Sequence, residues 1–128
     1  MVATADGDVL WSRRRVGEYW TPAAGAVLVL GDLRRLQVRI EIDEIDADAL
    51  RPRAHCELRS DGGEPLGSGR AVRVAPELGS RALLSERPSL RSDARVRDGF
   101  VEIASPSSLA PGQRVWAYCA RDGDRAPL

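Results

Sequence analysis

Apolar and polar residues alternate strictly along the segment Leu36–Asp43, whose sequence is LQVRIEID. A period of two is typical of a strand that buries one face and exposes the other. The same alternation recurs in three further segments bounded by Gly, Pro, Asp or Ser: Ala54–Arg59, Arg70–Val74 and Arg114–Ala120. Several short strands at this spacing predict an all-β fold, a small antiparallel β-barrel of about six strands.

One short helix is expected to interrupt the strands. The segment Glu44–Leu50 reads EIDADAL, with acidic residues at its start and Pro52 shortly after its end. Carboxylates near a helix start interact favourably with the helix dipole, and Asp43 fits as the N-cap. We therefore expect a helix of one or two turns that packs on the strands, because so short a helix is marginal alone.

Three other segments are less regular. In Asp93–Ile103 the alternation changes phase near Asp98 and Gly99, which predicts a β-bulge or a tight turn. The segment Pro76–Ser92 is polar with few leucines, which predicts a long connection without regular structure. Gly67–Gly69 precedes a strand instead of opening a helix, so it predicts a bend or turn and not a phosphate cradle.

The N-terminal stretch is predicted to form a separate small unit. Val9–Trp11 and Ala26–Leu30 have the composition of short strands, with a turn at Gly17–Tyr19 between them. The apolar residues of this stretch are too few for an independent core. We expect residues 1–31 to form a partial β unit, residues 32–121 the barrel domain and residues 122–128 a frayed tail.

The strand phases also predict the core, because alternate side chains point to the same face. The residues expected inside are Leu36, Val38, Ile40, Ile42, Ala54, Cys56, Leu58, Val72, Val74, Val101, Ile103, Val115 and Ala117. Cys119 shares the inward phase of its strand, and free Cys is among the most buried residue types. We expect Cys56 and Cys119 to be buried free thiols that share the core, with a disulfide between them as the alternative.

The charges exclude several classes of function. The 128 residues carry 19 basic and 19 acidic side chains, so the net charge is zero and no field concentrates nucleic acid on the surface. Every basic residue is Arg, and the absence of Lys removes lysine Schiff bases, lipoyl- or biotinyl-lysine and a P-loop lysine.

No apolar run approaches the roughly 18 residues of a membrane-spanning helix. Asp6 and Asp8 stand where a signal peptide would carry positive charge, so we expect no export signal in the chain as written.

No set of residues predicts catalysis. A nucleophile needs a base within reach, and the single imidazole, His55, adjoins Cys56 on a predicted strand, where neighbouring side chains point to opposite faces. Two cysteines and one histidine cannot supply a four-ligand zinc site. The acidic run from Asp43 to Asp48 lacks the central glycine and terminal glutamate of an EF-hand. We expect no catalytic residue, no cofactor and no metal, and therefore a protein that is not an enzyme.

Aromatic and Arg side chains are the remaining candidates for a functional surface. Both kinds of residue are enriched where proteins bind one another. Trp20, Arg34, Arg35 and Trp116 are therefore predicted to contribute to a partner interface. Trp11, Tyr19 and Tyr118 are further aromatic candidates of the same kind. For all five aromatic residues, filling the ends of a small barrel is the alternative.

Four segments together resemble the second half of membrane fusion proteins of the HlyD type, the periplasmic adaptors of bacterial export pumps. VGEYW resembles the turn that closes the family's lipoyl-like unit, and LVLGDLRRLQVRIEIDEIDADALRP resembles the opening of its β-barrel. GRAVRVAPEL and SLAPGQRVWAYC follow in the family's order and spacing, the second resembling its last barrel strand. Arg53 stands where the family commonly has Gly, so we expect the turn into the second strand to differ.

The resemblance implies a non-catalytic adaptor that contacts an inner-membrane transporter and neighbouring adaptor subunits on the periplasmic side of the membrane. It also implies weak self-association for the barrel alone. The family's membrane anchor, helical hairpin and first half of the lipoyl-like unit would precede Val9 and have no counterpart in this sequence. The competing interpretation is a free-standing cytoplasmic β-barrel that binds a partner, of the SH3-like or translation-factor kind, because such barrels share short alternating strands and Gly-Pro turns.

Overall fold

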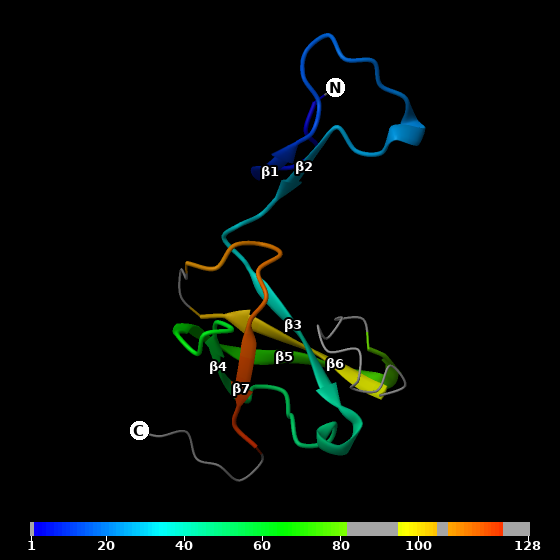
Figure 1. The fold of residues 1–128 in the computed structure, drawn as a ribbon. Coiled ribbons are helices and arrows are strands. Elements are labelled where there is room, and N and C mark those ends of the chain that lie inside the picture. Colours follow the sequence, from blue (N-terminus) through cyan, green and yellow to red (C-terminus); the bar gives the residue numbers. More distant parts are fainter. Residues whose placement is uncertain (1, 82–94, 105–107, 122–128) are drawn as a thin grey trace. The chain divides into compact units, whose positions relative to one another are not determined.

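The structure is a computed structural model that describes residues 2–81, 95–104 and 108–121 (Figure 1). It is nearly all β, and its described helical elements are two 3-10 helices of three residues each. The predicted all-β fold is confirmed. The chain divides into two compact units, Met1–Leu36 and Gln37–Leu128. None of the helices in the described ranges is long and apolar enough to cross a membrane.

The first unit is a two-stranded antiparallel sheet. Strand β1 (Asp8–Ser12) pairs with β2 (Leu28–Gly31), close to the two strands that the sequence predicts. Between them lie a turn, in which the Glu18 N–H donates to the Arg15 carbonyl, and the 3-10 helix η1 (Pro22–Ala24). None of residues 2–36 is fully buried. The unit therefore has no closed core of its own.

The second unit is a curled antiparallel half-barrel of five described strands (Figure 1). The strands are β3 (Gln37–Asp43), β4 (His55–Arg59), β5 (Pro65–Ser80), β6 (Arg95–Ile103) and β7 (Trp116–Cys119). Their order across the sheet is β3-β6-β5-β4-β7. Of the described strands, β3 and β7 are therefore the two edges.

The core lies on the concave face of this sheet. Cys56, Leu58 and Val101 are fully buried, as the strand phases predict. Most of the other predicted core residues are half-buried: Leu36, Val38, Ile40, Ile42, Ala54, Val74, Ile103, Val115 and Ala117. Four buried hydrophobic residues are absent from the predicted core: Ala47, Leu50, Ala71 and Val96.

Val72 is the predicted core residue that the structure contradicts. Its side chain is 44% exposed, and its neighbour Ala71 is buried instead. The pairing of β5 with β6 shifts register between Ala71 and Arg73. Such a bulge inserts one residue and exchanges the two faces of the strand beyond it, so a strict alternation through this segment fails.

Strand β5 is much longer than the sequence predicts, which corrects two further interpretations. It includes Gly67–Gly69, predicted as a turn, and residues 76–80 of the predicted irregular connection. Residues 82–92 of that connection lie outside the described residues. Gly69 is required within the strand because a Cβ at this position would lie 2.3 Å from the Glu102 carbonyl oxygen of β6.

The change of phase at Asp98 and Gly99 is neither a bulge in β6 nor a turn. Strand β6 pairs with β3 without a register shift from Val96 to Glu102. Gly99 faces the core, where a Cβ would lie 3.0 Å from Ile40 and 3.1 Å from Leu50. A glycine here leaves room for these larger side chains.

The acidic segment after β3 is tied to distant arginines. The predicted helix is the 3-10 helix η2 (Glu44–Asp46), and the buried Ala47 and Leu50 that follow pack it on the sheet. Asp43 does not cap η2 through its side chain, because its carboxylate pairs with Arg81 instead. Two further ion pairs of this segment join Arg97 to Asp48 at 3.0 Å and Arg121 to Asp46 at 3.0 Å.

A disulfide joins Cys56 to Cys119, so the expectation of two free thiols is wrong. The two residues lie directly opposite each other on β4 and β7. The adjacent Ala120 N–H donates to the His55 carbonyl, which makes the cysteines a non-hydrogen-bonded pair, the kind in which side chains approach most closely. The alternation in the sequence cannot reveal that strands so far apart in the chain become neighbours.

Arg53 adopts the left-handed backbone conformation that favours glycine, with φ at 72°. Its N–H donates to the Ala71 carbonyl at 2.7 Å, and the Ala71 N–H donates to the Ala54 carbonyl at 2.9 Å. These bonds fix the turn that leads into β4. The conformation is unfavourable for a residue with a Cβ by about 1–2 kcal/mol.

Reduction of the Cys56–Cys119 disulfide should lower the free energy of unfolding by about 4 kcal/mol, because the bridge restrains a long loop in the unfolded chain. The measurement is urea unfolding with and without a thiol reductant. The double variant Cys56→Ser/Cys119→Ser should be insensitive to the reductant. Equal unfolding midpoints for the wild type in both conditions would show that the cysteines are not bridged in solution.

Arg53→Gly should raise the free energy of unfolding by up to about 1 kcal/mol, because relief of the left-handed strain exceeds the entropy cost of a glycine. Arg53→Ala is the matched control, since it removes the exposed side chain and keeps the Cβ. The thermal midpoints of the three proteins test this. An alanine variant as stable as the glycine variant would contradict the strained turn.

Candidate interaction surface on strand β7

Strand β7 presents two large aromatic side chains on its outer face. Trp116 is 58% exposed and Tyr118 is 60% exposed, whereas the alternate residues Ala117 and Cys119 are half-buried. In the register with β4, Trp116 lies opposite Arg59 and Tyr118 lies opposite Glu57. The outer faces of β4 and β7 therefore form one surface, here called the β7 surface.

Specific contacts hold both aromatic rings. The Trp116 indole N–H donates to the Asp61 carboxylate at 2.8 Å. The Arg59 guanidinium lies 5.7 Å from the centroid of the Tyr118 ring, within cation–π range, and pairs with the Glu57 carboxylate at 3.2 Å. Side chains that are fixed before binding lose less entropy when a partner arrives. The β7 surface therefore has two exposed aromatic rings that are already oriented.

The backbone of β7 has one free side among the described strands. The Ala120 N–H donates toward β4, so the alternation of an antiparallel ladder also turns the N–H groups of Trp116 and Tyr118 toward β4. The N–H and C=O groups of Ala117 and Cys119 then point to the outer edge. In the part of the chain that the structure describes, no strand pairs with that edge. Such an edge can accept a further strand.

The predicted interface residues are distributed over both units. Trp116 lies on the β7 surface, whereas Trp20, Arg34 and Arg35 belong to the first unit. Trp20 is 39% exposed and its indole N–H donates to the Gly25 carbonyl at 2.8 Å. This bond closes the loop between β1 and β2.

Arg34 forms hydrogen bonds within its own turn. Its guanidinium donates to the Asp32 carboxylate at 2.9 and 3.1 Å, and its backbone N–H donates to the same carboxylate at 3.0 Å. These hydrogen bonds lower the pKa of Asp32, and the side-chain bond raises the pKa of Arg34. Arg35 is exposed beside it. The structure thus gives Arg34 a role in the turn between β2 and β3.

The sequence prediction missed Arg59 and Asp61, and it left Tyr118 open between an interface residue and a residue that fills the end of the barrel. Tyr118 has the same strand phase as Trp116 and lies two residues further on, so the alternation contains the signal for its exposure. Arg59 and Asp61 belong to β4 and the turn after it. Their place beside Trp116 depends on the pairing of β4 with β7, which the alternation does not specify.

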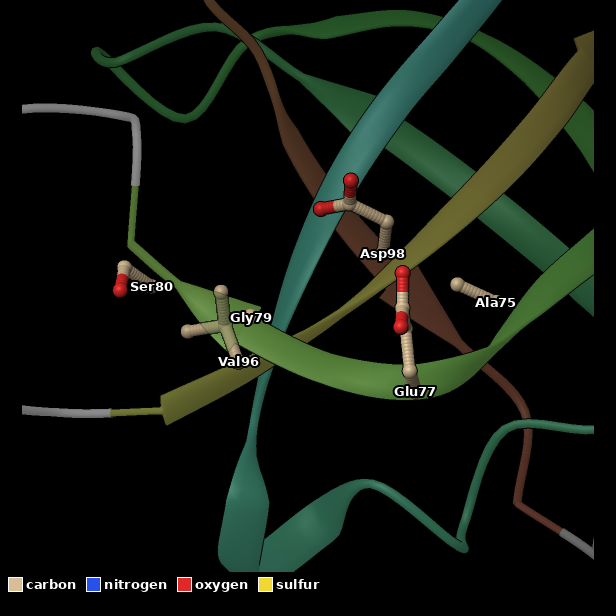
Figure 2. Close-up of a pocket in the computed structure, with 6 residues that line it drawn as sticks. All are labelled: Ala75, Glu77, Gly79, Ser80, Val96 and Asp98. Atoms are coloured by element: carbon tan, nitrogen blue, oxygen red, sulfur yellow. The ribbon is translucent and has the colours of Figure 1, made fainter.

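A small hollow is lined by residues of β5 and β6, which β4 separates from β7 in the sheet order (Figure 2). Its lining includes the carboxylates of Glu77 and Asp98, and its volume is about 90 Å³. Asp98 already pairs with Arg39 at 3.0 Å. Ligand pockets typically hold several hundred Å³, so this hollow is too small for an organic ligand.

His55 lies half-buried on the face of β4 opposite to Cys56, and Cys56 is occupied by the disulfide. Within residues 2–81, 95–104 and 108–121, no group of three or more His, Cys, Asp and Glu side chains could hold a metal ion. The β7 surface is therefore the candidate site with the most structural support.

Comparison with protein-family models, with curated proteins and with solved structures returns no match to this chain.

Proposed function

We propose that this chain is a non-catalytic interaction module, an adaptor subunit of a bacterial export system that contacts the inner-membrane transporter and neighbouring adaptor subunits. The observation that carries the proposal is the β7 surface. Trp116 and Tyr118 are exposed, oriented by Asp61 and Arg59, and placed on an edge strand. Trp, Tyr and Arg are the residues that most often dominate the binding energy of protein interfaces.

The backbone conformations of two turns support the resemblance to membrane fusion proteins. Arg53 occupies the position where that family commonly has Gly, and its φ of 72° is in the region that glycine favours. The segment SLAPGQ forms a turn before β7, in which the Gln113 side chain accepts from the Ala110 N–H at 3.1 Å and Gly112 has φ at 86°. Both segments thus use the backbone conformations that the family's glycines suit.

The disulfide supports a periplasmic location of the protein over the cytoplasmic alternative. Disulfides persist in oxidising compartments such as the bacterial periplasm and are rare in the cytosol. The Cys56–Cys119 bridge joins two strands of the half-barrel at its core. A free-standing cytoplasmic module would have to keep these two adjacent thiols reduced.

The test is binding of the full chain to the purified transporter encoded nearest its gene. Trp116→Ala and Tyr118→Ala should each raise the dissociation constant at least about tenfold, because each removes a central aromatic contact. Tyr19→Ala is the matched control, since it removes an aromatic ring that is 87% exposed in the first unit. Biolayer interferometry gives the dissociation constants, and circular dichroism shows whether the variants remain folded.

Two results would contradict the proposal. One is a wild-type chain that does not bind the transporter. The other is a pair of β7 variants that bind as tightly as the Tyr19 control.

A further inference from the structure

We infer that β7 is also a self-pairing edge, which joins two copies of this chain through an antiparallel β7–β7 contact with two-fold symmetry. The inference rests on the proposed function, because it assigns a second copy as a partner of the β7 surface. Three properties of β7 support it: the direction of its backbone groups, the order of its aromatic residues and its lack of charge.

The backbone fixes the register of such a pair. Residues directly opposite each other in an antiparallel pair lie on the same face of the sheet, so inward residues must meet inward residues. Ala117 directs its N–H and C=O to the outer edge, because the Ala120 N–H donates to β4 and the direction alternates from residue to residue. When Ala117 lies opposite the partner's Ala117, the two residues exchange two hydrogen bonds across the two-fold axis.

This register brings the aromatic residues together. With Ala117 on the axis, Trp116 lies opposite the partner's Tyr118, and Tyr118 lies opposite the partner's Trp116. All four side chains are on the outer face, where Trp116 and Tyr118 are exposed in the single chain. Cross-strand aromatic pairs stabilise antiparallel strands, so the strand is complementary to itself on the face that it exposes.

The charges allow the contact. The four residues of β7, WAYC, carry no charge, so no like charges face each other across the axis. The chain as a whole has a formal net charge of zero and does not repel a second copy. A strand of four residues buries a small area, so the pair should be weak and dependent on concentration.

The first test is sedimentation velocity of the purified full chain over a series of concentrations. The wild type should show a monomer–dimer equilibrium. Ala117→Pro removes the N–H at the two-fold axis, and this N–H points away from β4, so the half-barrel keeps its own hydrogen bonds. The variant should weaken dimerisation at least about tenfold.

A second set of variants reads the register directly. Trp116→Glu combined with Tyr118→Glu places like charges opposite each other and should abolish the dimer. Trp116→Glu combined with Tyr118→Lys places opposite charges face to face and should restore it. Both double variants lose the same two aromatic rings, so a difference between them reports the pairing of these positions and not general damage to the fold.

The outcomes separate this inference from the proposed function. A wild type that remains monomeric up to about 1 mM, or double variants that dimerise equally, would overturn the β7–β7 pair. If transporter binding still falls with Trp116→Ala in that case, the adaptor proposal stands without self-pairing. If the dimer forms with this register and no transporter binds, the inference stands and the adaptor proposal falls.

Discussion

The disulfide between Cys56 and Cys119 is the constraint on which the β7 surface depends. Strand β7 has only four residues, and β4 is its one neighbour among the described strands. A short strand with a single partner holds its register weakly, and a slip by one residue turns every side chain to the other face. The covalent bond between directly opposite residues prevents this slip. It therefore keeps Trp116 and Tyr118 on the outer face and the Ala117 N–H on the outer edge.

The long strand β5 gives the sheet the curvature that closes the core. Its start, from Pro65 to Arg70, pairs with β4, and the segment from Gly69 to Ser80 pairs with β6. The ladder with β6 shifts register twice, near Val72 and between Val74 and Leu78. Bulges of this kind bend a strand and increase its twist. Gly69 lets the β5 and β6 backbones approach closely where a Cβ would collide with Glu102. The curl places Cys56, Leu58 and Val101 on its inner face, and the disulfide forms within that core.

The sequence predicts the parts of this fold that depend on local periodicity. Leu36–Asp43 forms a strand because its alternation is unbroken, and Cys56 and Leu58 are buried for the same reason. The prediction fails at Val72, where a bulge changes the phase, and at Cys119, whose partner lies 63 residues away in the chain. Trp116 could be predicted as an interface residue from its type alone. Its setting could not, since Asp61 and Arg59 reach it only through the pairing of β4 with β7.

The two edges of the described sheet differ in how open they are to another strand. Along β3, the outward positions alternate with the core residues and include the exposed Arg39 and Asp43, which form ion pairs with Asp98 of β6 and with Arg81. Charged side chains on an edge strand hinder the approach of a further strand, because their desolvation opposes pairing. Strand β7 has no such charge and exposes aromatic rings instead. The charges of β3 protect one edge of the half-barrel, and a partner strand therefore meets the smaller barrier at β7.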